Sequence, residues 1–239
     1  TLVDRYDYSR GPAKLEIETD KPLWVDYIAD LGDGFDSTYA MASLLASESL
    51  DVKASGGATE QLPAGRLLII GGDAVYPYAS EPEYERRFIQ PYDLTVWHKS
   101  ESERANPERR LFMLPGNHDW YDGLAAFDRL FCQRRDDISE GRIIGPYRCR
   151  QHRSYFAIKL PHDWWIWGID TQLSSNLDVG QIKYFHLIAE SMKKSPDQAK
   201  VILCIPEPAW YHGAEVGSEQ GYSPNLQRIG IADGVGDRG

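Results

Sequence analysis

Short apolar runs, each followed by turn residues and then by a helical pattern, characterise the first half of the chain. Three runs, at residues 23–29, 66–70 and 111–114, have the length and apolar content of buried strands. Helical patterns follow them at about residues 39–45, 81–90 and 124–132. Repeated strand, loop and helix units of this kind indicate an α/β fold.

A different pattern follows a basic interval at residues 142–150, which we expect to be irregular. Residues 154–160 and 164–169 are rich in aromatic and β-branched side chains, and the turn residues 161–163 separate them. This pattern predicts a β-hairpin, and we expect its strands to belong to a second sheet.

A final helix and strand are predicted further along the chain. Ile182, Phe185, Ala189 and Met192 recur at helical spacing on one face, and the apolar residues 201–205 follow. Within the hairpin, the side chains of Trp164, Trp165 and Trp167 are expected in the core, with a substrate platform as the alternative.

Composition and charge exclude several classes of protein. The chain has 239 residues, 42% of them hydrophobic, which is enough for one sizeable core, and no 18-residue apolar run predicts a membrane span. With 26 Lys and Arg against 36 Asp and Glu, the net charge is -10. This balance disfavours a nucleic-acid-binding surface and suits cation binding. No pattern indicates an oligomeric state.

The cysteines indicate neither a disulfide framework nor a zinc knuckle. Cys132, Cys149 and Cys204 are scattered and form no C-x-x-C pair, so we expect them to be reduced and structural, as in a cytoplasmic protein. The chain begins at Thr1 without a signal peptide, so a processed product or an excised domain is expected.

Polar side chains directly follow the three predicted strands of the first half. They are Asp30, Asp73, Asn117, His118 and Asp119. If the strands are neighbours in one parallel sheet, these side chains converge at its carboxyl edge, where α/β folds bind ligands. Two carboxylates placed together require a cation to offset their repulsion. The sequence therefore favours a metal site that could act on a phosphoryl group.

A capping role is the alternative for these residues. A lone aspartate after a strand is commonly a turn residue or a helix cap, and Asn117 to Asp119 could cap a helix that begins near Asp122. A dinucleotide-binding domain is not supported, because no G-x-G-x-x-G motif follows a strand.

Three motifs resemble those of the calcineurin-like metallophosphoesterases. Asp30-Leu31-Gly32 matches D-x-G, Gly72-Asp73 with Tyr76 matches G-D-x-x-Y, and Gly116-Asn117-His118-Asp119 matches G-N-H-D. The combination of D-x-G with G-D-x-x-Y resembles the purple acid phosphatase branch in particular. The motifs lie within residues 23–123, and a looser resemblance continues to about residue 210.

The resemblance implies a fold and a set of metal ligands. The fold would be a four-layer αββα sandwich of two mixed sheets flanked by helices, in a single domain over residues 1–239. Asp73 would bridge two metal ions, Asp30 would bind the first and Asn117 the second. Tyr76 would be a phenolate ligand of a ferric ion, in place of a histidine at position 32; a packing role is the alternative for this tyrosine.

The resemblance also implies an activity. The metal pair would be iron with zinc, manganese or a second iron, and the reaction would be hydrolysis of a phosphate ester in a small-molecule or phosphorylated substrate by in-line attack. His118 would act as proton donor or transition-state stabiliser, and Asp119 would hold its ring.

Two motifs of the family are not matched. Where the fourth motif would place a histidine after residues 201–205, this chain has Pro206, and Cys204, Glu207 and His212 are the nearby candidate substitutes. The fifth motif, G-H-x-H, is absent, and we expect a truncated domain whose missing histidines lie beyond Gly239. A degenerate, non-catalytic binding or scaffold module is therefore the alternative function.

Overall fold

The strands predicted at residues 23–29, 66–70 and 111–114 lie side by side in one sheet of the computed structural model. The structure describes residues 6–9, 22–105, 109–132, 141–171, 177–194 and 199–206. It divides into a larger unit, Glu16–Ser154, and a smaller unit, Thr1–Leu15 with Tyr155–Gly239. The single domain over residues 1–239 stays a prediction.

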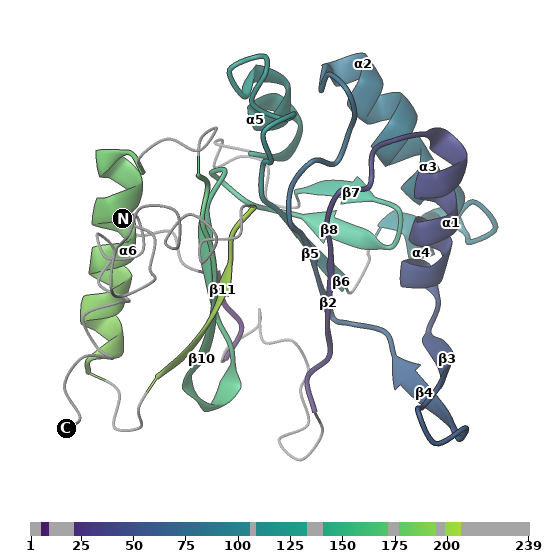
Figure 1. Cartoon of the computed structure of the whole chain (residues 1–239), viewed down its shortest axis with the longest axis horizontal. Coiled ribbons are helices and arrows are strands. Elements are labelled where there is room, and N and C mark those ends of the chain that lie inside the picture. Colours follow the sequence, from purple (N-terminus) through teal and green to yellow (C-terminus); the bar gives the residue numbers. More distant parts are fainter. Residues whose placement is uncertain are drawn as a thin grey trace. The chain divides into compact units, whose positions relative to one another are not determined.

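The larger unit contains a mixed five-stranded sheet (Figure 1). Its strand order is β2 (Val25–Ile28), β5 (Leu67–Ile70), β6 (Arg109–Met113), β8 (Tyr147–Cys149) and β7 (Arg142–Ile144). The first four strands are parallel, and β7 pairs with β8 in the antiparallel sense. The carboxyl ends of β2, β5 and β6 therefore lie next to one another.

The helices of the larger unit follow these strands. They are α1 (Phe35–Ala46), α2 (Glu81–Tyr84), the π-helical turn η1 (Glu85–Ile89), α3 (Gln90–Leu94), α4 (Glu101–Ala105) and α5 (Ala125–Phe131). A separate hairpin of β3 (Ser49–Lys53) and β4 (Thr59–Pro63) follows α1.

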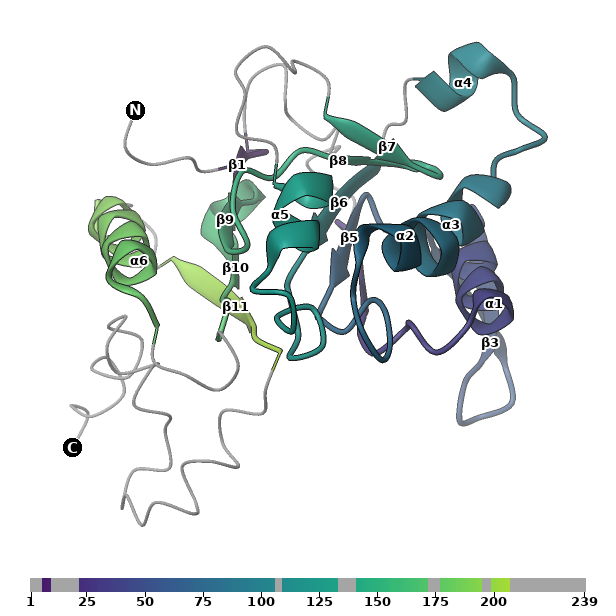
Figure 2. The same ribbon diagram turned by 90° about the horizontal axis from the view of Figure 1, so that it is seen from above.

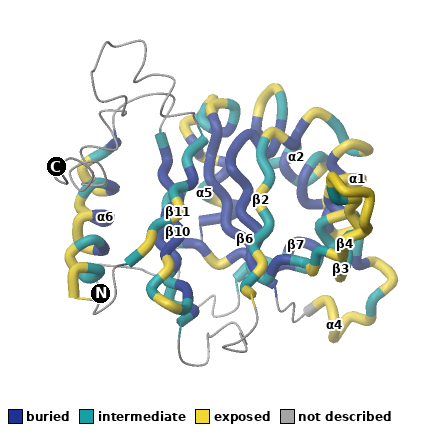
Figure 3. Tube along the Cα trace, turned by 60° about the horizontal axis from the view of Figure 1, so that its bottom comes forward, coloured by how far each residue is buried: buried dark blue, intermediate teal, exposed yellow. Residues whose placement is uncertain are grey.

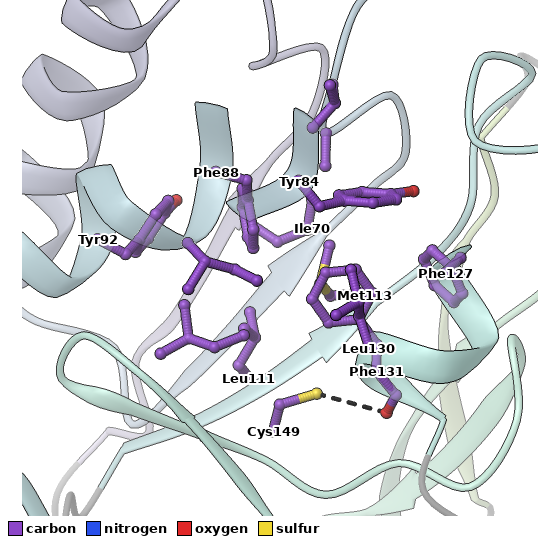
Figure 4. Close-up of a cluster of buried hydrophobic side chains, with 14 of the residues drawn as sticks. Ile70, Tyr84, Phe88, Tyr92, Leu111, Met113, Phe127, Leu130, Phe131 and Cys149 are labelled. Atoms are coloured by element: carbon purple, nitrogen blue, oxygen red, sulfur yellow. Dashed lines mark hydrogen bonds between the residues drawn. The ribbon is translucent and has the colours of Figure 1, made fainter. Parts of the chain in front are cut away.

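One hydrophobic core joins this sheet to its helices (Figure 4). Ile70 of β5 and Met113 of β6 are paired in register. Because side chains alternate between the two faces along each strand, these two face the same side of the sheet. They pack with Phe88 of η1 and with Phe127 and Phe131 of α5, all fully buried. Most residues of β6 are buried, whereas only Thr38 and Ala42 are buried in α1 (Figure 3). Packing of these helices therefore fixes the strands that lead to the candidate site.

The helix expected at residues 81–90 extends further, to Leu94, through α2, η1 and α3 in succession (Figure 2). Pro91 has no amide hydrogen, and its ring clashes with the carbonyl four residues earlier in a regular α-helix. A π-helical turn precedes it, in which the Gln90 amide donates to the Glu85 carbonyl five residues back. The wider turn accommodates the proline, so α3 extends to Leu94.

The smaller unit contains a second mixed sheet. Its order is β1 (Tyr6–Asp7), β9 (Phe156–Lys159), β10 (Trp164–Gly168) and β11 (Lys200–Cys204). The predicted hairpin is confirmed as the antiparallel pair β9 and β10, joined through a short 3₁₀ turn, η2 (Pro161–Asp163).

Helix α6 (Val179–Met192) packs on this second sheet. Its Phe185 lies 4.9 Å from Trp167, ring centroid to ring centroid, and Trp165 belongs to the same core. Core packing is therefore confirmed for these two tryptophans, whereas Trp164 is 39% exposed.

The mixed α/β class with two mixed sheets and helices is confirmed, but one interval was predicted wrongly. Residues 142–150 are not irregular, since they form β7 and β8. The basic residues Arg142, Arg148 and Arg150 interrupt the apolar pattern that predicts strands, although Ile144, Tyr147 and Cys149 are fully buried. None of the described helices is both long and apolar enough to cross a bilayer.

Candidate active site

Asp30 and Asp73 follow two neighbouring strands, β2 and β5. Their loops are tied by backbone hydrogen bonds: the Gly71 amide donates to the Ile28 carbonyl at 2.8 Å, and the Asp30 amide donates to the Gly72 carbonyl at 3.1 Å. Both aspartates adopt left-handed backbone conformations, with φ of 57° and 51°, which aspartate tolerates better than most residues. The two loops therefore turn sharply at the same edge of the sheet.

The hydroxyl of Tyr76 lies between the two carboxylates. It is 2.9 Å from Oδ1 of Asp30 and 3.1 Å from Oδ2 of Asp73. Burial, followed by the hydrogen bonds and charges of both carboxylates, raises the pKa of Tyr76 well above its usual range. The structure thus brings together the three oxygen donors predicted for the first cation.

The close packing around position 32 explains why this chain has glycine there (D-x-G) and not histidine (D-x-H). A Cβ atom at this position would lie 2.2 Å from the Cα of Val75 and 2.5 Å from the carbonyl oxygen of Ala74. The Gly32 carbonyl also accepts a hydrogen bond from the Tyr76 amide at 3.1 Å. A histidine cannot occupy position 32 with this backbone, and the close approach of the loops delivers Tyr76 to the site.

The loop that follows β6 contacts the side chain of Asp73. The amide of His118 donates to Oδ1 of Asp73 at 2.9 Å, and a Cβ atom on Gly116 would lie 2.2 Å from the same oxygen. Glycine is therefore required at position 116 for the loop to approach the carboxylate. One oxygen of Asp73 faces Tyr76 and the other faces this loop.

The ring of His118 is held differently from the prediction. Its Nδ1 lies 2.8 Å from the carbonyl oxygen of Pro77. Since a carbonyl can only accept, Nδ1 carries the proton and donates it, which leaves Nε2 for chemistry. The prediction that Asp119 holds this ring was wrong, because the side chain of Asp119 is fully buried and bonded elsewhere.

Asp119 holds the two loops together instead. Its Oδ2 accepts hydrogen bonds from the amides of Asp73 and Gly116, both at 2.8 Å, and its Oδ1 accepts one from the hydroxyl of Tyr84. Burial raises the pKa of Asp119 to about 6, against the lowering effect of these hydrogen bonds. Asp119 is thus a positioning residue, and it couples the G-D and G-N-H-D loops to helix α2.

Replacing Tyr84 by phenylalanine should cost stability, whereas the same change at Tyr92 should not. Both tyrosines are fully buried in one core (Figure 4). The Tyr84 hydroxyl donates to Asp119, while the Tyr92 hydroxyl has no hydrogen-bond partner among the described residues. Because a hydrogen bond to a charged group contributes about 1.5–3 kcal/mol, Tyr84→Phe should lower the free energy of unfolding by about 2 kcal/mol.

The matched variant Tyr92→Phe should unfold at the same denaturant concentration as the wild type, or a higher one, since it removes only an unpaired buried hydroxyl. Urea unfolding of the full chain near neutral pH measures both. Equal losses in the two variants would contradict the role assigned to the contact between Tyr84 and Asp119.

Asn117 is an exposed residue of the loop that follows β6. Its Nδ2 donates to the hydroxyl of Tyr121 at 3.2 Å, so the amide oxygen keeps its lone pairs available. The capping alternative does not apply to Asn117, His118 or Asp119. Helix α5 is capped by Asp122, whose carboxylate accepts from the amides of Ala125 and Ala126 at 3.0 and 2.9 Å.

No basic side chain of the described residues neutralises these carboxylates. Within the described ranges, Asp30, Asp73 and Asp119 form no ion pair and accept no hydrogen bond from Lys or Arg. Clustered carboxylates without a counter-charge are costly unless a cation is present. The oxygen donors of Asp30, Asp73, Tyr76 and Asn117 are those that hard cations prefer. The donor set therefore fits the metal ions that the resemblance implies.

The set differs from a conventional cluster of charged ligands. In the part of the chain that the structure describes, no group of three or more His, Cys, Asp or Glu side chains could hold a metal ion. Two of the four donors here are a phenol and an amide. Of the candidate substitutes for the fourth motif, Glu207 and His212 lie outside the described residues. Cys204 is buried at the end of β11, and burial raises the pKa of its thiol to about 11.

Comparison with known families agrees with this geometry. The family model for calcineurin-like phosphoesterases matches residues 23–216, which include every residue of the site. The chain therefore belongs to the calcineurin-like phosphoesterase family. Searches of curated proteins and of solved structures gave no significant match.

Proposed function

We propose that this protein hydrolyses a phosphate ester with the help of two bound cations. The observation that carries the proposal is the convergence of Asp30, Asp73 and Tyr76 through contacts of 2.9 and 3.1 Å, without a Lys or Arg partner among the described residues. A phosphate dianion would be repelled by such a site unless cations neutralised it. Membership of the family supports phosphoester hydrolysis as the reaction class.

The proposed ligand sets follow the loops. Asp30, Asp73 and Tyr76 would hold the first cation, and Asp73 with the amide oxygen of Asn117 would hold the second. Iron paired with zinc, manganese or a second iron is the proposed combination, as in the purple acid phosphatase branch. Bound cations would supply the positive charge that neutralises the phosphate oxygens and polarises the bond to be broken.

The protein's own contribution to the chemistry centres on His118. With Nδ1 donating to the Pro77 carbonyl, a protonated imidazole presents its second proton at Nε2. As the ester bond breaks, Nε2 would give this proton to the leaving oxygen, and the ring would become neutral with Nδ1 still bonded. Asp119 contributes by fixing the loops that carry Asp73 and His118.

A second candidate function is cation binding without turnover, as in a scaffold or binding module. Pro206 favours it, because the family motif has a metal-binding histidine at this point and proline has no donor side chain.

Hydrolysis of 4-nitrophenyl phosphate separates the two candidates. The full chain should release nitrophenol when supplied with iron, manganese or zinc ions, and a chelator should stop the reaction. With an alkyl phosphate, whose leaving oxygen needs the proton, His118→Gln should reduce kcat by roughly 10²- to 10⁴-fold while cation binding is retained. If the wild type binds cations yet shows no turnover with any of them, the binding module takes the place of the enzyme.

A further inference from the structure

Tyr121 is an exposed aromatic residue in direct contact with the proposed proton donor. Its ring centroid lies 4.8 Å from that of His118, with 54° between the ring planes, and 48% of the residue is exposed. No motif of the sequence assigned it a role. A leaving group that takes a proton from His118 could contact this half-exposed aromatic ring.

The turn after β6 fixes where this ring lies. The amide of Trp120 donates to the Asn117 carbonyl at 3.2 Å, and the Tyr121 amide donates to the His118 carbonyl at 3.4 Å. These tight turns bring the tyrosine back beside the imidazole. At the far end of the ring, the hydroxyl accepts the hydrogen bond from Asn117 Nδ2. The ring is thus held at both ends.

Among the described residues, Tyr121 offers a ring for stacking, and no Lys or Arg side chain bonds to it or to His118. In the described residues, neither His118 nor Tyr121 has an ion pair or hydrogen bond with Lys or Arg, and the nearest charged group bonded to His118 is the carboxylate of Asp73. No described Lys or Arg side chain is therefore placed to bind a charge on the leaving group itself. A planar aromatic group can instead stack on the tyrosine ring.

We propose that Tyr121 forms a subsite for an aromatic leaving group, so that the protein prefers aryl over small alkyl phosphate esters. The proposal rests on the proposed function, in which His118 protonates the leaving oxygen. That oxygen lies beside His118, so the rest of the leaving group meets the neighbouring ring of Tyr121. Stacking on this ring would stabilise an aryl group and not a small alkyl group.

Binding of two phosphonates tests the subsite without turnover. In benzylphosphonate and ethylphosphonate a methylene replaces the ester oxygen, so neither is hydrolysed, and they differ in the phenyl group. Calorimetric titration of the full chain, with manganese present, should give at least roughly fivefold tighter binding of the benzyl compound. Tyr121→Leu should bring this preference close to one, whereas Tyr121→Phe, which keeps the ring, should retain it.

Tyr39→Leu is the matched control. Tyr39 is also an exposed tyrosine beside an aromatic neighbour, Phe35, but it lies on α1, and no described hydrogen bond or ring contact joins it to the site. This variant should keep the wild-type preference. Because each preference is a ratio within one protein, a change in cation affinity affects both phosphonates alike.

The outcomes distinguish the subsite from the activity. If the wild type binds both phosphonates equally, or if Tyr121→Leu keeps the preference, the subsite is wrong while the phosphoesterase proposal stands. If the cation-supplied wild type binds neither phosphonate, the proposed function fails and the subsite fails with it.

Discussion

Asp73→Asn should reduce the kcat/KM of phosphate ester hydrolysis by on the order of 10³-fold or more. The substitution keeps the shape of the side chain but removes the charge that would bridge the two cations. Bound cations typically contribute several kcal/mol of transition-state stabilisation, and each 1.36 kcal/mol is tenfold in rate. Hydrolysis of 4-nitrophenyl phosphate, with cations in excess, measures the loss.

Asp51→Asn provides the control for this change. Asp51 is an exposed aspartate on β3 and belongs to no site contact, so its amide variant should hydrolyse the substrate like the wild type. Turnover by Asp73→Asn within a few fold of the wild type would contradict the role assigned to this carboxylate.

Gly32→Ala should destabilise the protein by about 3–5 kcal/mol, the largest stability effect we expect from a single methyl group. The added Cβ would lie 2.2 Å from the Cα of Val75 and 2.4 Å from its nitrogen, and backbone atoms cannot move aside as a flexible side chain can. The loops after β2 and β5 would have to separate. Urea unfolding measures the cost, and cation affinity should fall with it, since Tyr76 depends on the same approach.

Gly56→Ala is the comparison for the glycine variant. Gly56 lies in the turn between β3 and β4, and no atom lies within 4 Å of a Cβ built there. Its substitution should change the free energy of unfolding by less than about 1 kcal/mol. A similar small effect for Gly32→Ala would show that the two loops are not packed as closely as this structure has them.

The main strands could be predicted from the sequence because their signals are strong. β5 and the last three residues of β6 are apolar runs that lead into turn residues, and burial on both faces requires such runs in a parallel sheet. The hairpin of β3 and β4 was not predicted, since most of its side chains are exposed. Only Leu50 and Val52 alternate with polar residues in β3, and β4 shows no such alternation. The π-helical turn depends on how the chain relieves the clash at Pro91, which no local pattern encodes.

The candidate site divides in the same way. Asp30, Asp73 and the G-N-H-D segment could be found because they follow strands, and the sheet brings them to one edge. Tyr84 and the carbonyl of Pro77 could not, because their contacts with Asp119 and His118 join residues 35 and 41 positions apart. Such long-range contacts depend on the packing of helix α2 and its preceding loop, and a sequence pattern shows neither. Tyr121 directly follows the motif, but only its ring contact with His118 gives it significance.

Equilibrium cation binding tests the central claim most directly, because it requires neither the right substrate nor turnover. The full chain, freed of metal and then titrated with manganese or zinc ions, should bind about two cations per molecule. Asp30→Asn should weaken one of these sites, Asp73→Asn should abolish or strongly weaken both, and Asp51→Asn should change neither. A wild-type protein that binds no cation, or an Asp73→Asn variant that binds as the wild type does, would contradict the account.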